Sequence, residues 1–401
     1  MNILFLTLLD FDSLNESNIY TDLLREFIRH NHSVYVISPV EKRKNIDTHI
    51  IEEDNCKILK LKIGNTQKTN IIEKGISTVR IEPDFIRAIK KHFADVKFDL
   101  VMYSTPPITF CGAIEYIKKR DNARTYLLLK DIFPQNSVDI GMLSKDGVKG
   151  KIYKHFRKQE KKLYAISDRI GCMSEANVKY VLANNPEVSA DKVEVCPNSI
   201  EPLDMSCSGE DRIAIRRKYN LPLDKKIFVY GGNLGMPQGI DFLIDCMQRQ
   251  NFGDVEFLII GNGTEYSKLK KFVDETDRQN IILMKYLPKD DYDRMIGACD
   301  VGMIFLDHRF TIPNFPSRLL SYMQAKLPVL TVTDPNTDIG TIAEENGFGV
   351  KCISDNPEDF VRAVNRLKSM DMPNMGEKAF AFMQQEYTVD KSYEIITRLM
   401  E

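Results

Sequence analysis

Short apolar runs alternate with amphipathic segments along almost the whole chain. A first series of runs covers residues 3–9, 33–39, 98–104, 124–129 and 169–174, and a second covers 226–232, 255–261, 280–287, 301–306 and 328–333. Between runs lie segments such as Ile19–His30, in which Leu23, Leu24, Phe27 and Ile28 form one apolar stripe. Near-continuous apolar strands that alternate with helices are typical of parallel sheets covered on both faces. The pattern therefore predicts an α/β protein.

The two series are similar in size, so the sequence predicts two Rossmann-like, doubly wound domains. A chain of 401 residues is too long for one core, which agrees with this division. Between Pro197 and Pro222, the segment NSIEPLDMSCSGED contains turn formers and little periodicity. We therefore expect domains at residues 1–200 and 201–385. Two such sheets facing each other would form a cleft, because each binds ligands beyond the carboxyl ends of its strands.

Composition narrows the class of protein. The 43% of hydrophobic and 28% of charged residues are ordinary for a soluble globular protein, and the formal net charge of -2 argues against a dedicated nucleic-acid binder. The eight cysteines are scattered without a CxxC spacing, which fits a reducing compartment. The first apolar run lacks the features of a signal peptide, and no window approaches eighteen apolar residues. We expect a cytoplasmic protein.

Glycine and polar residues gather where the strands of the second series end. The first of these strands runs into YGGNLGMPQGIDFL, the second ends in GNG, and the third ends at YLP. Any one glycine-rich turn can be purely structural, but successive strand ends of this kind indicate a nucleotide-type ligand. The GxGxxG pattern of a dinucleotide site is missing after the first strand of the chain. The candidate donor-binding residues here are Gly232, Asn233, Gln238, Gly261, Asn262, Gly263, Tyr286 and Leu287.

The stretch NFPSRLLSYMQAKLPVL, Asn314 to Leu330, places a proline, a serine and an arginine between two apolar segments. If Pro316 is the first helical residue, the free N–H groups of the helix start and the Arg318 guanidinium form an anion pocket suited to phosphate. A helix start that binds nothing is the alternative, since prolines begin many helices. The candidate donor-binding residues of this stretch are Asn314, Phe315, Pro316, Ser317, Arg318, Ser321 and Tyr322.

These segments resemble the donor-binding half of glycosyltransferase family 4, which has the GT-B fold. The likeness is carried by GGNLGMPQG, GNG and NFPSRLLSYMQAKLPV. In the first half, NIYTDLLREFIRHNHSVYVISP resembles the family's opening helix and second strand, LLLKDIFPQNSVDIG its acceptor-side segment in bacterial surface-polysaccharide members, and CPNSIEP the crossing between domains. The resemblance covers nearly the whole chain. It implies that a C-terminal helix, within about residues 386–401, packs back on the first domain.

The resemblance also implies an activity. It implies a retaining, hexosyltransferase-type enzyme that moves a sugar, such as an N-acetylated hexose or deoxyhexose, from a UDP-sugar to a lipid-linked or saccharide acceptor in capsule or O-antigen synthesis. No metal, cofactor or nucleic-acid partner is expected. A UDP-sugar 2-epimerase of the same fold and a non-catalytic nucleotide-sugar-binding module are the alternatives.

The sequence departs from the family pattern at two points. Two glutamates that many members carry around the phosphate-binding helix are replaced by Pro313 and Ser321, and the basic pair of the glycine-rich loop is replaced by Asn233 and Gln238. Arg318 therefore becomes the candidate catalytic residue that neutralises the diphosphate, with help from Arg309. The missing carboxylates make an epimerase less attractive, and they leave the non-catalytic module open.

Asp131, in KDIFPQ, is the second candidate catalytic residue. A carboxylate at the carboxyl end of a strand is well placed to orient or deprotonate an acceptor hydroxyl. The alternative is a cap for the turn before Phe133-Pro134. The sequence Asp10-Phe11-Asp12 resembles the metal-binding DxD of another glycosyltransferase fold, but its place after a first strand favours turn chemistry.

The segment Lys145–Lys162 is rich in positive charge, with eight Lys and Arg residues against Asp146 and Glu160. It also has an apolar stripe, formed by Ile152, Phe156, Leu163 and Tyr164. A solvated helix packed on its own sheet and a helix that contacts an anionic membrane explain this pattern equally well. A lipid-linked acceptor would suit the second explanation.

Overall fold

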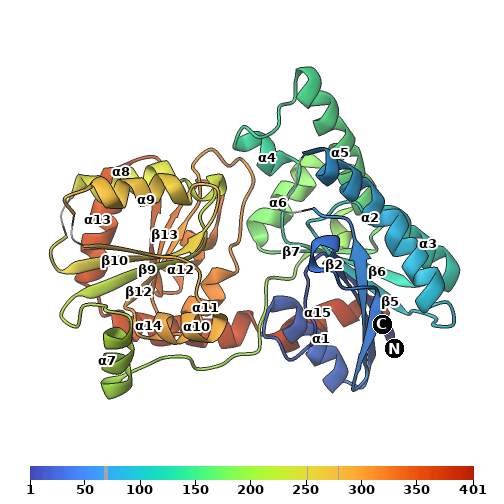
Figure 1. The fold of residues 1–401 in the computed structure, drawn as a ribbon, viewed down its shortest axis with the longest axis horizontal. Helices are drawn as coiled ribbons and strands as arrows, with labels where there is room; N and C mark the ends of the chain where they lie inside the picture. Colours follow the sequence, from blue (N-terminus) through green and yellow to red (C-terminus); the bar gives the residue numbers. More distant parts are fainter. Residues whose placement is uncertain (67–70, 251, 279) are drawn as a thin grey trace. The chain divides into compact units, whose positions relative to one another are not determined.

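The computed structural model describes residues 1–66, 71–250, 252–278 and 280–401, and it divides the chain into two compact units (Figure 1). Unit 1 comprises Met1–Glu201 and Val389–Glu401, and unit 2 comprises Pro202–Thr388. The expected boundaries at residues 200 and 385 lie within a few residues of these. No helix in the described ranges is long and apolar enough to cross a membrane.

Unit 1 contains an eight-stranded sheet in the order β3-β4-β2-β1-β5-β6-β7-β8. The strands are β1 (Asn2–Leu6), β2 (Ser33–Glu41), β3 (His49–Glu53), β4 (Cys56–Ile63), β5 (Leu100–Ser104), β6 (Arg124–Leu129), β7 (Arg169–Cys172) and β8 (Val193–Val195). The pairs are parallel except that β3 runs antiparallel to β4. The apolar runs predicted five of these strands. They did not predict β3, β4 and β8, which are short or interrupted by charged residues.

The helices of unit 1 are α1 (Ile19–Arg29), α2 (Ile71–His92), α3 (Cys111–Asp121), α4 (Gln135–Asp139), α5 (Gly147–Ile166), α6 (Glu175–Asn184) and α15 (Val389–Thr397). One core cluster packs α1 and α15 against β1, β2, β5 and β6. In it, Tyr393 of α15 stacks on His30, with ring centroids 3.9 Å apart, and its hydroxyl lies 2.9 Å from His32 Nε2. The end of the chain is therefore part of the N-terminal unit.

Unit 2 contains a six-stranded parallel sheet in the order β11-β10-β9-β12-β13-β14. Its strands are β9 (Lys226–Asn233), β10 (Val255–Asn262), β11 (Ile281–Met284), β12 (Val301–Phe305), β13 (Val329–Thr333) and β14 (Gly349–Ile353). Its helices are α7 (Gly209–Lys218), α8 (Ile240–Arg249), α9 (Tyr266–Glu275), α10 (Lys289–Gly297), α11 (Arg318–Gln324), α12 (Ile339–Glu345), α13 (Pro357–Lys368) and α14 (Met372–Glu386). The strand order reverses between β9 and β12, so the loops after these two strands flank the usual ligand-binding position.

Asp10 and Asp12, the pair that resembles a metal-binding motif, hold a lysine in unit 1. The Lys60 side chain of β4 is 1% exposed, and its Nζ lies 2.6 Å from Asp10 Oδ1 and 2.9 Å from Asp12 Oδ1. It also donates to the carbonyl oxygen of Phe11. These aspartates lie in the β1–α1 loop, as expected, but they fix that loop to the sheet through Lys60 rather than form a turn.

Replacing Lys60 by methionine should destabilise unit 1 by roughly 2 kcal/mol, less than a fully buried pair would cost, because Asp10 is partly exposed and keeps Lys44 as a partner. Burial alone would raise the pKa of the Asp10 carboxyl. Its bonds to Lys44 and Lys60 lower the pKa by more than that, so the net pKa is below the ordinary value. The stabilisation is therefore present at neutral pH and lost as the pH falls through that lowered pKa.

Urea unfolding at neutral and acidic pH measures this effect. Lys62→Met is the matched control, since Lys62 lies on the same strand but forms an exposed pair with Asp47. It should change stability by less than about 1 kcal/mol. Equal effects of the two substitutions would contradict the structural role of Lys60.

Candidate functional site

Arg318 is the first residue of α11 and follows the loop that flanks the switch point of unit 2. Its guanidinium carbon lies 4.4 Å from the ring centroid of Tyr230, within the range of cation–π attraction. The guanidinium also lies against Gly232, where an added Cβ would be 3.2 Å from Nη2. Gly232 has a φ of +135°, which favours glycine. The sequence around β9 therefore leaves room for the arginine at the end of that strand.

Three tyrosines lie near the Arg318 side chain: Tyr230 from β9, Tyr292 from α10 and Tyr322 from α11. The Tyr322 hydroxyl accepts a hydrogen bond from Gly231 N–H at 3.2 Å and donates one to a carbonyl oxygen of β12 at 3.1 Å. Burial raises the pKa of all three phenols. The rings are therefore neutral at physiological pH, and they shield the guanidinium from water without neutralising it.

The positive charge of Arg318 has no counter-charge in the described part of the chain. The guanidinium forms no ion pair there, and its Nη1 atom is buried without a hydrogen-bond partner. Burial acts to lower the pKa of Arg318, but Tyr230 and Tyr322 raise it, and the net pKa lies above the ordinary value. A buried, unpaired cation is costly, so this arrangement is suited to an anionic ligand.

The start of α11 differs from the expectation. Pro316 is not the first helical residue: α11 begins at Arg318, with Ser317 as its N-cap. The N–H groups of Leu319 and Leu320 donate to the carbonyl oxygens of Pro316 and Ser317 at 3.2 and 3.0 Å. These short-range bonds use main-chain donors that the sequence-based prediction assigned to phosphate. The guanidinium, rather than a row of amides, is therefore the main candidate for binding an anion.

The glycine-rich loop after β9 is held by its own side chains. Gln238 Oε1 accepts hydrogen bonds from Gly235 N–H at 3.1 Å and from Asn233 Nδ2 at 3.4 Å. Gly239 has a φ of +60° and precedes α8, and an added Cβ would lie 3.3 Å from Asp307 Cα. The loop therefore packs directly on the β12 end. Asn233 and Gln238, predicted to bind the donor, shape this turn.

The predicted donor residues of β10 lie beside those of β9, with Gly261 paired to Gly232 and Asn262 to Asn233. An added Cβ on Gly261 would be 1.9 Å from Gly232 O, and one on Gly263 would be 2.2 Å from Leu234 O. These two glycines are thus required by close packing of main chain. Asn262 is exposed at the strand end, and its Oδ1 accepts from Gly263 N–H at 2.9 Å.

The remaining predicted donor residues lie in the loop before α11, in α11 itself and just after β11. Asn314 N–H donates to Thr337 Oγ1 at 3.0 Å, which ties the loops after β12 and β13 together, and Ser317 and Ser321 keep exposed surface. The Tyr322 side chain is 0% exposed, which argues against a direct contact with the donor, and its donor-binding role stays a prediction. Tyr286 is 77% exposed, and with the half-buried Leu287 it follows β11, at the edge of the sheet and two strands from β9.

Arg309, expected to assist Arg318, is already paired. Its Nε lies 2.9 Å from Asp307 Oδ1 and its Nη2 lies 2.7 Å from Oδ2, a bidentate arrangement. Burial would raise the pKa of Asp307, but its bonds to Arg309 hold the net pKa below the ordinary value. The charge of Arg309 is therefore compensated within the loop, which leaves Arg318 as the unpaired cation of this site.

Asp131 lies in unit 1, between β6 and α4. Both of its carboxylate oxygens accept from Asn136 Nδ2 at 2.9 Å, and its main-chain N–H donates to Thr105 Oγ1 at 3.2 Å. Burial raises the pKa of Asp131 to about 6, and the hydrogen bond from Asn136 opposes that rise. Asp131 is not the N-cap of α4, which is Pro134. A carboxylate with this pKa can act as a base near neutral pH.

Comparisons with known proteins indicate the class of protein. Residues 211–381, which lie in unit 2, match the family described as glycosyl transferases group 1. The chain is 24% identical over 332 residues to the probable glycosyltransferase WbjE of Pseudomonas aeruginosa, covering 82% of this chain and 80% of that protein. It is 23% identical over 291 residues to the putative colanic acid biosynthesis glycosyl transferase WcaI of Escherichia coli, covering 71% and 69%.

The fold has solved counterparts. The crystal structure of Anabaena Alr3699/HepE in complex with UDP superposes with a TM-score of 0.70 at 13% identity, covering 100% of this chain and 99% of that one. Two doubly wound units, a cationic strand-end site in the second unit and the match to residues 211–381 lead to one conclusion. The chain is a glycosyltransferase of the GT-B fold, and its residues 211–381 match the group 1 family.

Proposed function

We propose that this enzyme moves a sugar, of the N-acetylated hexose or deoxyhexose class, from a UDP-sugar to a lipid-linked or saccharide acceptor, with retention at the anomeric carbon and without a metal. The observation that carries the proposal is the Arg318 guanidinium at the strand ends of unit 2, whose Nη1 atom is buried and has no hydrogen-bond partner among the described residues. The UDP complex of HepE supports a UDP donor, and the name of WcaI supports a polysaccharide product.

Charge development gives Arg318 its role. The bond between the anomeric carbon and the diphosphate oxygen breaks, and UDP leaves with the bonding electrons. Negative charge then grows on the leaving oxygens, and a fixed guanidinium stabilises the diphosphate more as the bond breaks. Stabilisation that increases toward the transition state is what accelerates a reaction. The neutral tyrosines around Arg318 strengthen this effect because they exclude water.

Asp131 acts as the base for the acceptor hydroxyl. Its carboxylate receives a hydrogen bond from the acceptor hydroxyl and takes the proton as the new bond to the anomeric carbon forms. Asn136 holds both carboxylate oxygens and so orients the group.

A panel of radiolabelled UDP-sugars, incubated with the protein and a lipid-diphosphate-linked saccharide, tests the proposal. The expected result is transfer of label to the acceptor with one donor. Epimerisation of the donor, or donor binding without turnover, would contradict a transferase role. Calorimetry with UDP alone provides the simplest check, since a protein that does not bind UDP cannot use this donor class.

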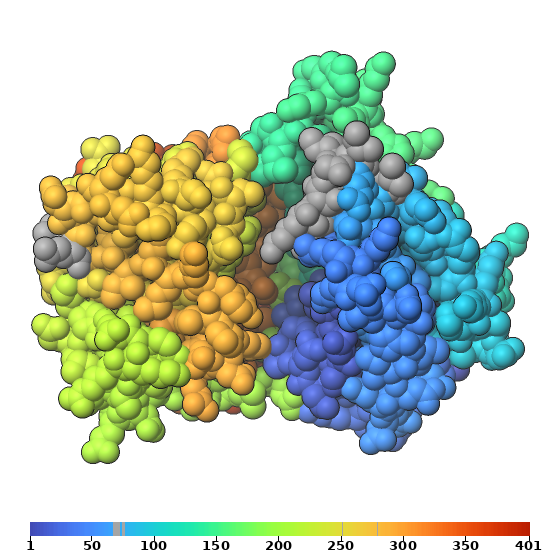
Figure 2. All heavy atoms as spheres, viewed as in Figure 1, coloured from blue at the N-terminus to red at the C-terminus, as the bar shows by residue number. Residues whose placement is uncertain are grey.

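We also propose that α5 contacts an anionic membrane, as a lipid-linked acceptor would require. Figure 2 shows the α4–α5 connection and the start of α5 projecting from unit 1. The expected apolar stripe is buried only in part: Leu163 and Tyr164 are buried, whereas Ile152 is 44% exposed. Met142 and Val148 are also exposed, at 58% and 79%. Around them lie exposed lysines with no carboxylate partner in the described chain: Lys145, Lys149, Lys151, Lys154 and Lys158.

Replacing Lys149, Lys151 and Lys154 together by glutamine should weaken binding to vesicles that contain anionic lipid by roughly 100-fold, at about 1 kcal/mol for each charge. Co-sedimentation measures this binding. The matched control replaces Lys270, Lys271 and Lys289, which pair with acidic residues one turn further along their helices. Binding that does not depend on anionic lipid, or that both triple variants lose equally, would contradict the contact.

A further inference from the structure

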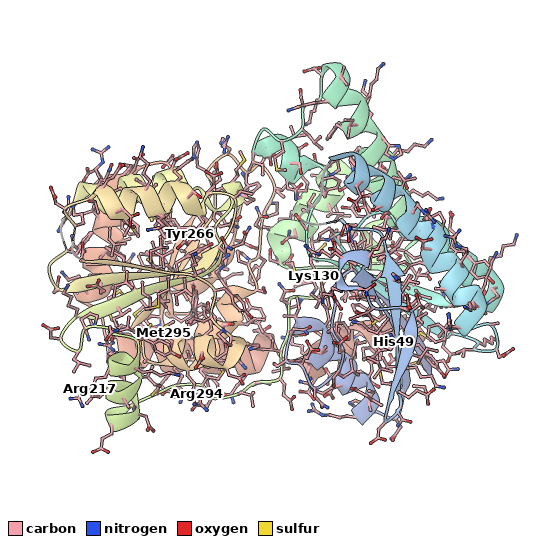
Figure 3. The ribbon with its side chains drawn as sticks, in the orientation of Figure 1. His49, Lys130, Arg217, Tyr266, Arg294 and Met295 are labelled. Carbon is pink, nitrogen blue, oxygen red and sulfur yellow. The ribbon has the colours of Figure 1, made fainter. Side chains whose placement is uncertain are left out.

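A lysine without an ion-pair partner in the described ranges also lies at the strand ends of unit 1, where Lys130 directly follows β6 (Figure 3). Lys130 Nζ has one hydrogen bond in the described ranges, to Pro197 O at 3.4 Å, which is longer than usual for such a bond. An ammonium group has three donors, so most of its capacity is unused. It forms no ion pair with any described carboxylate.

Lys60 shows how this chain treats a buried lysine that has only a structural role. Lys60 has two carboxylates and a carbonyl oxygen within 2.9 Å of its Nζ. Lys130 pairs with no carboxylate in the described ranges, although Asp131 is the next residue. The Asp131 carboxylate is instead bound by Asn136. Lys130 is therefore not explained by an internal salt bridge.

The groups that face Lys130 do not neutralise it. They are the thiols of Cys172, at the end of β7, and Cys196, just after β8. Burial raises the pKa of both thiols, so they carry no charge near neutral pH. The strands β6, β7 and β8 are neighbours in the sheet, and these residues lie at their carboxyl ends, where a doubly wound sheet binds ligands.

We propose that Lys130 binds a phosphate group of the acceptor. The inference rests on the proposed function and adds the chemical class of the acceptor. The Lys130 ammonium and the Asp131 carboxylate have different partners, Pro197 O and Asn136, so the phosphate and the reacting hydroxyl are held by separate groups. A sugar joined to a lipid diphosphate carries such a phosphate, and a neutral saccharide does not.

The test uses the full chain saturated with UDP, so that the donor site is occupied, and inorganic pyrophosphate as the probe. Calorimetry should detect pyrophosphate binding to the wild type. Lys130→Met should weaken it by about 10-fold or more, the value of one charge-assisted hydrogen bond. Lys130→Arg should retain it. Lys192→Met is the matched control, because Lys192 also donates to a carbonyl oxygen, that of Ser167, at 3.2 Å. It should bind as the wild type does.

The pH dependence adds a signature that a structural lysine would not produce. Burial lowers the pKa of Lys130 to about 8. Between about pH 7 and about pH 9 the wild type should therefore lose affinity for pyrophosphate relative to Lys130→Arg, whose guanidinium stays charged. The comparison of the two proteins cancels the ionisation of the probe itself.

Each result decides the question. Equal pyrophosphate affinity in Lys130→Met and the wild type, or no binding to the UDP-saturated wild type, overturns the inference but leaves donor binding intact. Weaker UDP binding by Lys130→Met would place the lysine at the donor and overturn it as well. Failure of the wild type to bind UDP would remove the proposed function itself. Matching thermal melting temperatures show that the variants are folded.

Discussion

Replacing Arg318 by alanine should lower kcat by about 100-fold or more at saturating donor, which is the effect of removing one donor that stabilises a developing anion. The reason is the absence of a substitute: the only nearby arginine of the loop, Arg309, is bound to Asp307 at both carboxylate oxygens. Initial rates with saturating UDP-sugar measure the effect, and calorimetry with UDP measures the accompanying loss of affinity.

Two further variants make the Arg318 result specific. Arg318→Lys keeps the charge but loses the planar contact with Tyr230, so its kcat should lie between those of the wild type and the alanine variant. Arg309→Ala should leave kcat nearly unchanged. Because Arg318 forms no ion pair with any described residue, its alanine variant should melt at no lower temperature than the wild type. An unchanged kcat in Arg318→Ala would remove the residue from the mechanism.

Replacing Asp131 by asparagine should lower kcat/KM for the acceptor by about 100-fold to 10,000-fold, the range for loss of a general base. The base works only when it is ionised, so wild-type kcat/KM should rise with pH through the Asp131 pKa of about 6 and then level off. The asparagine variant should lack this acidic limb. A pH-rate profile of both proteins measures the difference.

Asn136→Ala provides the control for that profile. Asn136 donates to both Asp131 oxygens, and these bonds lower the pKa of the carboxyl against the effect of burial. Without them the acidic limb should move to higher pH, while the rate at high pH changes less. An acidic limb that persists in Asp131→Asn would assign it to another group, and the proposal for Asp131 would fail.

The fold was predictable where one physical signal dominates. Central strands such as β9 and β10 are buried on both faces and appear as continuous apolar runs. The edge strand β3 has exposed His49 and Glu52, its neighbour β4 is interrupted by three lysines, one of them the buried Lys60, and the other edge strand β14 carries an exposed lysine. Such edge strands lack the apolar run, so a reading based on burial misses them.

The site was predictable only in part. The NFPSR stretch identified Arg318, because an arginine beside a helix start suggests anion binding in any chain. Tyr230 and Tyr292 were not predicted, since they come from β9 and α10 and approach the arginine only in the folded sheet. Lys130 was not singled out for the same reason, although it adjoins Asp131. Its unusual feature is that it has no ion-pair partner in the described ranges, and a sequence does not show which side chains pair.

The stacking of Arg318 on Tyr230, with Gly232 on another side, has a consequence for affinity. A free arginine side chain gives up as much as about 2 kcal/mol of rotamer freedom when it is immobilised. In this protein, folding has already immobilised the side chain. The guanidinium is therefore held in place before the diphosphate binds. In a Tyr230→Leu variant the arginine would regain this freedom, so the diphosphate would no longer meet a preorganised charge.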